Sequence, residues 1–199
     1  MRFVLLAIAI FVASSGIARA HEGHVHTTVR ATGSANQLRG SLNVRNGPFY
    51  GNVATTTAFL DNVSLGAAFG ISNDHVGIEA FAEANMLRAD ASWMDLGARP
   101  YVQIGHHGGL FLAGFWGITT GFTTSSTLLE GELLEASLEG AMFFGLETGV
   151  WYPVTESLQL ELGPTFRRRV INEEHDDHGH EVSGVIDQLG LRLSLGGNL

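Results

Sequence analysis

Six of the nine histidines fall into two short clusters that could bind a metal ion. The first cluster is His21-Glu22-Gly23-His24-Val25-His26, and the second lies in the acidic segment 173–181. Imidazole rings with carboxylates nearby suit Zn²⁺, Cu²⁺ or Ni²⁺. The residues expected to bind such an ion are His21, His24, His26, His175, His178 and His180. No cofactor is required on this interpretation, and the alternative for each cluster is a solvated polar segment.

Charged side chains form a second set, at alternate positions within apolar segments. Glu79 and Glu83, for example, alternate with apolar residues such as Ala80. Paired carboxylates could carry out acid–base chemistry, but arginines occupy matching positions in other segments. Because an unpaired buried charge costs several kcal/mol, we expect ion pairs in a shared interior. The residues expected there are Arg39, Arg45, Glu79, Glu83, Asp95, Arg99, Glu139, Glu147, Glu161, Arg167 and Arg192, with Arg169 as a further candidate near the outer rim.

The elements that position these side chains are strands, because a period-two alternation recurs along the chain and predicts an all-β fold. The expected strands cover residues 38–45, 49–60, 63–71, 75–85, 93–105, 109–122, 136–152, 157–171 and 182–196, with a weaker one at 26–32. Most of them reach the ~9–11 residues that a tilted strand needs to cross a bilayer. After residue 20 no apolar stretch reaches the ~20 residues of a membrane helix. A membrane form must therefore be a closed antiparallel barrel.

Every second connection between these strands is short, which is typical of periplasmic turns alternating with longer outer loops. The short connections lie at residues 46–48, 72–74, 106–108 and 153–156, and the longer ones at 86–92, 123–135 and 172–181. The short Asp61-Asn62 connection departs from this pattern. Since both ends of such a barrel lie on one side, the number of strands must be even. We expect an up-and-down transmembrane barrel of 8 strands, with 10 as the alternative.

In this architecture residues 38–196 resemble the small outer-membrane β-barrels of Gram-negative bacteria, the OmpA-like and OmpX-like class. The resemblance implies a location in the outer membrane and contact with membrane lipids and lipopolysaccharide. A barrel of 8 strands is only wide enough to be filled by its own side chains. We therefore expect an interior plugged by ion pairs, with a selective pore as the alternative, and a monomer as the assembly state.

The first 20 residues have the parts of a secretory signal peptide. Met1-Arg2 precedes an apolar run over residues 3–13, and Ala18-Arg19-Ala20 is an A-x-A cleavage site. We expect cleavage after Ala20, a His-containing tail over residues 21–37 and a barrel domain over residues 38–199. The tail then lies on the side of the short turns and residues 175–180 on the other side, so the two histidine clusters form separate sites.

The composition excludes several classes of function. All 11 basic residues are Arg, and with 20 acidic residues the net charge of −9 argues against nucleic-acid binding. The absence of cysteine excludes thiolate metal sites and cysteine nucleophiles. The motifs G-x-S-x-G and H-E-x-x-H do not occur in the sequence, and we expect no enzymatic activity.

The leading hypothesis is a non-enzymatic outer-membrane barrel with an ion-paired interior and metal-binding histidine segments. Two alternatives stay open at this point. One is a narrow outer-membrane channel or metal-handling porin. The other is a soluble periplasmic β-sandwich or barrel that binds a metal or another ligand.

Overall fold

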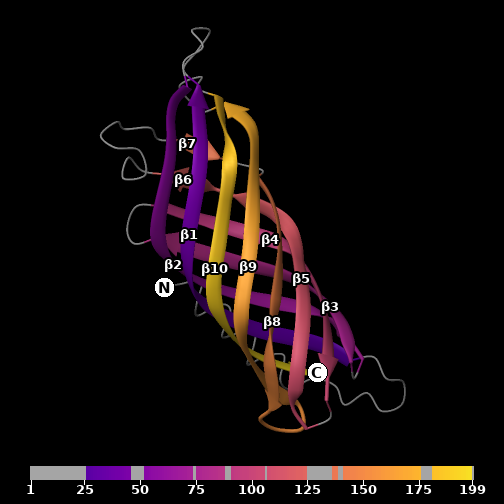
Figure 1. The fold of residues 1–199 in the computed structure, drawn as a ribbon. Helices are drawn as coiled ribbons and strands as arrows, with labels where there is room; N and C mark the ends of the chain where they lie inside the picture. The colour runs from indigo at the N-terminus through magenta and orange to yellow at the C-terminus, as the bar shows by residue number, and fades with distance from the viewer. Residues whose placement is uncertain are drawn as a thin grey trace.

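Eight strands of the computed structural model close into one antiparallel barrel, in the order β1-β10-β9-β8-β5-β4-β3-β2 (Figure 1). The structure describes residues 26–45, 52–73, 75–87, 91–105, 107–124, 136–138, 141–175 and 181–198. The barrel strands are β1 (His26–Arg45), β2 (Asn52–Ser72), β3 (Val76–Leu87), β4 (Ala91–Ile104), β5 (Gly109–Thr120), β8 (Ala141–Pro153), β9 (Leu158–His175) and β10 (Glu181–Asn198). In the connection between β5 and β8, β6 (Phe122–Thr124) pairs with β7 (Ala136–Leu138). The expected all-β barrel of 8 strands is confirmed.

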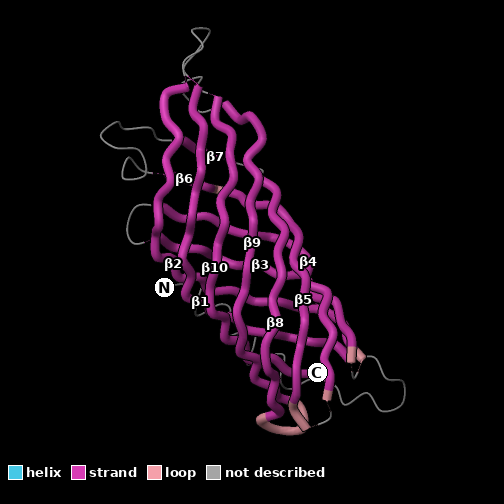
Figure 2. Tube along the Cα trace, viewed as in Figure 1, coloured by secondary structure: helices cyan, strands magenta, loops and turns pink. Residues whose placement is uncertain are grey.

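The barrel has a turn end and a loop end, and the described turns, pink in Figure 2, gather at the turn end. At the turn end the strands are joined by residues 73–75, 105–108 and 154–157, and at the loop end by residues 46–51, 88–90, 121–140 and 176–180. The first turn is held by Asn73, whose Oδ1 accepts the backbone N–H groups of His75 and Val76 at 3.0 and 2.8 Å. Thr28, near the start of β1, pairs with Asn198 at the end of β10. The first strand therefore begins, and the last strand ends, at the turn end. In the part of the chain with assigned structure, no helix is long and apolar enough to span a bilayer.

One wall of the barrel is much taller than the other. Strands β1, β2, β9 and β10 contain 20, 21, 18 and 18 residues, whereas β3, β4, β5 and β8 contain 12, 14, 12 and 13. β2 pairs with β1 from Asn52 onward but with β3 only from Val63 onward. The four long strands therefore continue past the others at the loop end, where they rise together in Figure 1.

Two expected boundaries differ from the structure. β1 begins at His26, so residues 26–37, expected in the tail, belong to the barrel. β2 runs unbroken through Asp61 and Asn62, which were expected to form a turn. Asn62 faces the interior, where its Oδ1 accepts a hydrogen bond from Asn36 at 2.9 Å and its Nδ2 donates to the Met86 carbonyl at 3.2 Å. The two strands expected on either side of Asp61 are thus one, which makes the number of strands 8.

Most of the outer surface of the barrel is apolar, and ten charged side chains are buried inside. Large apolar side chains are exposed on seven of the eight barrel strands, for example Leu65, Ile78, Leu96, Leu112, Leu146, Leu162 and Leu191. We call this surface the apolar belt. On β1 the corresponding outward positions carry small residues such as Ala31 and Ala35. This arrangement is the reverse of a soluble protein and is what a lipid-facing barrel requires.

Candidate functional site

The interior of the barrel contains ten buried charged side chains, each at most 2% exposed. Five are basic and five are acidic: Arg30, Arg99, Arg167, Arg169 and Arg192 face Glu79, Glu83, Asp95, Glu147 and Glu161. The described interior is therefore electrically neutral. The excess negative charge of the chain, −9 in total, is carried outside it.

The half of the interior nearer the turn end contains the turn-side cluster: Arg30, Glu79, Arg99, Glu147 and Glu161. Arg99 lies at its centre, with Nη1 3.0 Å from Glu79 Oε2 and Nη2 2.8 Å from Glu161 Oε2. The Nε atom of Arg99 is 3.2 Å from Glu147 Oε2. Arg30 completes the cluster, with Nε 3.1 Å from Glu79 Oε1 and Nη1 2.7 Å from Glu161 Oε2. The five residues belong to five different strands, so these ion pairs hold opposite walls of the barrel together.

Glu83, Asp95, Arg167 and Arg169 form the loop-side cluster. Arg167 binds Glu83 through both terminal nitrogens, at 2.8 and 2.9 Å, and this bidentate geometry is the strongest form of the pair. Its Nη1 is also 3.0 Å from Asp95 Oδ2. Arg169 forms an ion pair with the same carboxylate. Thr119 donates to Asp95 Oδ1 at 2.8 Å and Asn85 donates to Asp95 Oδ2 at 3.1 Å, so this carboxylate is satisfied from three strands.

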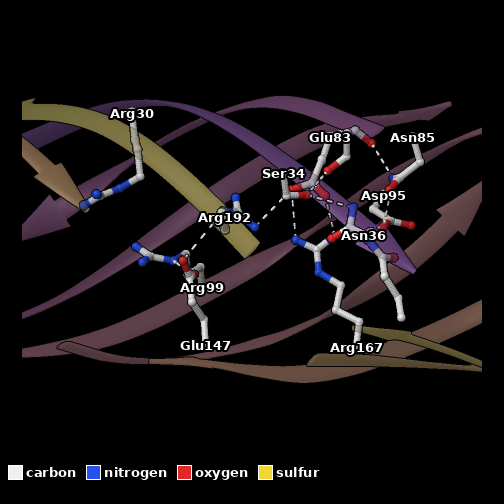
Figure 3. Close-up of polar contacts among 12 residues, drawn as sticks. Arg30, Ser34, Asn36, Glu83, Asn85, Asp95, Arg99, Glu147, Arg167 and Arg192 are labelled. Atoms are coloured by element: carbon white, nitrogen blue, oxygen red, sulfur yellow. Dashed lines mark hydrogen bonds and ion pairs between the residues drawn. The ribbon is translucent and has the colours of Figure 1, made fainter. Parts of the chain in front are cut away.

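Arg192 lies between the two clusters, beside Arg99 and Glu147 on one side and the Glu83–Arg167 pair on the other (Figure 3). Its Nη1 is 3.0 Å from Glu83 Oε2, and its Nε is 3.9 Å from Glu147 Oε1. The second distance is too long for a hydrogen bond. Arg192 thus links the two clusters. Its guanidinium is less closely paired with carboxylates than those of Arg99 and Arg167.

Aromatic rings fill the space around the guanidinium groups. The Cζ atom of Arg167 is 4.6 Å from the ring centroid of Phe115, and that of Arg99 is 5.2 Å from the ring of Tyr101. Phe81 packs edge-on against Phe115 with 5.6 Å between centroids. Such contacts between a cation and a desolvated ring contribute up to about 2 kcal/mol each. The arginines are therefore held by packing as well as by charge.

A cavity of about 250 Å³ lies at the turn end. Its lining is mostly polar and includes Ser72, His75, Tyr101, Gln103, Trp151 and Gln159. Gln103 Nε2 donates to Glu161 Oε1 at 3.0 Å, and Gln159 Nε2 lies 3.4 Å from the same oxygen. The inner end of the cavity therefore adjoins the turn-side cluster.

Eight of the residues expected inside lie in these buried groups: Glu79, Glu83, Asp95, Arg99, Glu147, Glu161, Arg167 and Arg192. The side chains of Arg45 and Glu139 lie outside the described residues. Arg39 is a correction, because it is exposed and faces outward while its neighbour Leu38 is buried inside. Arg39 and Leu38 lie beyond the end of the apolar belt, where the outer surface meets water. There the apolar Leu38 faces inward and the charged Arg39 faces outward. The same reversal occurs on β10, where Ile186 is buried.

One interior arginine, Arg30, was not expected. It was missed because the outward positions around it are small residues, so the apolar side of its strand is weak in the sequence. Its signal is the polar series at alternate positions, Thr28, Arg30, Thr32, Ser34 and Asn36, all of which are buried. Arg169, a candidate near the outer rim, lies two positions after Arg167, on the same face of β9, and is buried.

The predicted metal ligands lie mostly outside the described residues, namely His21, His24, His178 and His180. His26 begins β1 opposite Ser72 at the turn end, and His175 ends β9 opposite Glu181 at the loop end. One residue of each cluster is thus placed, His26 at the turn end and His175 at the loop end. Within the ranges for which coordinates are described, no group of three or more His, Cys, Asp or Glu residues is arranged to hold a metal ion.

The chain matches no protein-family model and no curated protein sequence. It is similar in structure to neisserial surface protein A, with a TM-score of 0.60 and 14% identity over 89% of this chain and 100% of that one. It also aligns with the outer membrane protein OprG of Pseudomonas aeruginosa, with a TM-score of 0.49 and 12% identity over 87% of this chain and 96% of that one. Ail, the attachment invasion locus protein of Yersinia pestis, aligns with a TM-score of 0.33 and 12% identity over 84% of this chain and 99% of that one. At this level of identity, the first similarity shows that the two chains share a fold, the small barrel of outer-membrane proteins.

Proposed function

We propose that this chain is a monomeric, non-enzymatic barrel of the outer membrane whose interior is closed by its own ion pairs. The observation that carries the proposal is the combination of the apolar belt with a neutral charged interior. Membrane lipid can cover the apolar belt. Nothing else in a folded protein of this size explains an apolar outer surface around a charged interior. The turn end then faces the periplasm and the loop end faces outward.

The same interior argues against an enzyme and against an open channel. Each of the five buried carboxylates has an arginine nitrogen within 3.2 Å, so none is poised as a general acid or base. A channel would require the clusters to separate, which leaves buried charges uncompensated at several kcal/mol each. Function is therefore assigned to the exposed ends of the barrel rather than to its centre.

Two measurements test this proposal. A folded membrane barrel resists SDS and changes its mobility on a gel only after boiling, so the outer-membrane fraction should show this shift. Purified protein inserted in planar bilayers should give no stable conductance steps, with a general porin inserted in parallel as the positive control. Recovery as a soluble periplasmic protein contradicts the membrane assignment, and reproducible conductance steps support the channel alternative.

The loop end is the place where we propose that Zn²⁺, Cu²⁺ or Ni²⁺ binds. The β9–β10 pairing sets His175 opposite Glu181 at the ends of the strands that the segment 176–180 joins, and this segment adds His178 and His180. Segments 122–140 and 173–181 together carry nine acidic residues and no arginine, and both belong to this end of the barrel. A concentration of negative charge attracts cations and supports binding by histidine. The tail histidines at the turn end form a second, separate candidate.

Calorimetric titration with Zn²⁺ and Cu²⁺ tests this loop-end site. The triple variant His175→Asn, His178→Asn, His180→Asn should lose the binding isotherm, whereas the control His107→Asn, at the turn end, should keep it. Binding should also weaken below about pH 6, because the imidazole must be deprotonated to bind a metal. Equal binding by the triple variant and the wild type contradicts a loop-end site and directs attention to the tail.

A further inference from the structure

Several buried polar atoms on the β8–β9–β10 wall have no hydrogen-bond partner within the protein. They are Glu147 Oε1, Thr165 Oγ1, Arg167 Nε, Arg192 Nε and Ser194 Oγ. The strand register brings them together: Thr165 pairs with Glu147 across β9 and β8, and Arg192 and Ser194 are successive inward positions on β10. An unsatisfied buried polar atom costs about 1–3 kcal/mol, so five of them in one place call for a partner that is not part of the chain.

The chemistry of these atoms identifies the partner. Arg192 offers N–H donors, Glu147 Oε1 offers an acceptor, and the hydroxyls of Thr165 and Ser194 can act as either. A bare anion is repelled by the glutamate, and a bare cation is repelled by the arginine. Water donates and accepts at once and satisfies both kinds of group, and buried waters typically make about three such bonds. The gap of 3.9 Å between Arg192 Nε and Glu147 Oε1 is also a separation at which a bridging water is to be expected.

Other polar groups lie between this group of atoms and the turn-end cavity. Ser194 pairs with Glu161, and Glu161 accepts the side-chain hydrogen bond of Gln103, which lines the turn-end cavity. The next inward position on β10, Gly196, pairs with Gln159, which lines the same cavity. Polar groups therefore continue without a break from the cavity to Arg192.

The other end of the interior is closed by apolar groups. Leu38, Ile171 and Ile186 are buried there, at 5%, 3% and 5% exposure, on three of the four long strands, β1, β9 and β10. Water has few partners among such side chains, and apolar constrictions close pores by excluding it. The interior thus has a polar half that adjoins the turn-end cavity and an apolar closure toward the loop end.

From this geometry we infer that the barrel holds a water-filled half-channel, which starts at the turn-end cavity, reaches Arg192, Glu147 and Thr165, and ends inside the barrel. The ion pairs of the two clusters are then joined by water along one wall and in direct contact along the others. This inference goes beyond the closed barrel proposed above. Ions cannot cross the barrel, but water enters its interior from the turn end.

The absence of cysteine from the sequence makes single-cysteine variants a clean test. Ser194→Cys and Thr165→Cys place a thiol on the proposed water path with little change in volume. The matched control is Ala68→Cys, which is 5% exposed and packs in the apolar group of Phe81, Phe115 and Phe143. All variants are folded in micelles, checked by the gel shift on boiling, and treated with a small charged methanethiosulfonate. Because the thiolate is the reactive form and a charged reagent reaches it only through water-filled space, reactivity reports hydration.

We expect Ser194→Cys and Thr165→Cys to react at least tenfold faster than Ala68→Cys, and none of the three to react with a bulky polyethylene-glycol maleimide. Reaction of both path variants no faster than the Ala68→Cys control overturns the inference. A second measurement uses the wild-type chain and does not depend on any variant. Nuclear magnetic resonance should detect magnetisation transfer from water to the Nε–H of Arg192, and a well-resolved Nε–H signal without such transfer also overturns the inference. Neither result bears on membrane insertion, which the gel shift decides separately.

Discussion

Phe143 and Phe144 are consecutive residues of β8 that face opposite environments: Phe143 is 2% exposed and Phe144 is 53% exposed. The ring of Phe143 lies 6.0 Å from that of Phe81 in the interior, and Arg167 and Arg169 lie within 6 Å of it. Phe144 belongs to the apolar belt. The two phenylalanines thus have different roles: Phe143 packs against arginines in the interior, and Phe144 contacts lipid.

This pair gives a stability prediction with its own control. Phe143→Ala leaves a cavity beside two buried arginines and should lower the free energy of unfolding by about 3–5 kcal/mol. Phe144→Ala removes the same atoms from the lipid-facing surface and should cost clearly less. Urea unfolding in lipid vesicles, followed by tryptophan fluorescence, measures both. Equal losses for the two variants contradict the assignment of Phe143 to a packed interior.

Glycines opposite Phe143 explain why its ring fits. A Cβ atom at Gly117 would lie 2.7 Å from the Phe143 ring and 2.1 Å from the Leu96 carbonyl oxygen, which is closer than van der Waals contact permits. Gly117→Ala should therefore prevent normal closure between β4 and β5, and the gel shift on boiling should be lost or weakened. Gly114→Ala is the control, because a Cβ there meets its nearest atom, in the Pro100 ring, at 3.7 Å. A normal shift for Gly117→Ala argues that these strands are not pressed together as described.

Arg99 is the arginine whose loss should be most damaging. Its guanidinium is within 3.2 Å of three carboxylates, and Arg99→Met leaves them together in the interior with only part of their positive charge. Breaking a buried ion pair by removing one partner costs about 3–5 kcal/mol, and we expect at least that loss in urea unfolding. Arg168→Met is the control, since Arg168 pairs with Asp187 on the outer surface and its side chain is 44% exposed. It should change stability little; a similar loss in both variants is evidence against the central role of Arg99.

A double-mutant cycle on Arg167 and Glu83 should show coupling. Each single variant, Arg167→Met or Glu83→Gln, leaves a buried charge without its bidentate partner, at 2.8 and 2.9 Å in the wild type. The double variant removes both charges and keeps the interior neutral, so its loss should be smaller than the sum of the single losses. The expected coupling is on the order of 1–3 kcal/mol from the urea midpoints. Strict additivity indicates that the pair is not in contact.

Much of the barrel could be predicted from the sequence because a bilayer imposes a strict two-residue pattern. Each strand needs an apolar outward face, and an unpaired charge cannot be buried inside. The alternation therefore placed eight charged residues correctly on the inward faces of the strands. The pattern loses strength where lipid does not impose it. On β1 the outward residues are small, so Arg30 gave no clear signal, and above the apolar belt the pattern reverses, so Arg39 was assigned to the wrong face.

The joining of two expected strands into β2 has a different cause. Asp61-Asn62 has the composition of a turn, because both side chains can bond to nearby backbone in turns. Here Asn62 bonds instead to Asn36, directly opposite it on the neighbouring strand β1, a contact between residues 26 positions apart. No local pattern contains that information. The pairing of particular arginines with particular carboxylates, such as Arg99 with Glu161, is equally non-local.

The apolar belt itself can be tested at its centre on β10. Leu191 is 55% exposed between Leu189 and Leu193, which are also exposed, and it immediately precedes the buried Arg192. Arginine on the lipid face of a barrel costs about 2–4 kcal/mol near the bilayer midplane. Leu191→Arg should therefore lower the folded fraction in lipid vesicles, seen as a weaker shifted band on gels and a lower urea midpoint, while Leu191→Phe should keep both. The contrary result is a Leu191→Arg variant as stable as the wild type and recovered in the soluble periplasmic fraction. In that case the outer surface meets water, and the charged interior belongs to a soluble barrel instead.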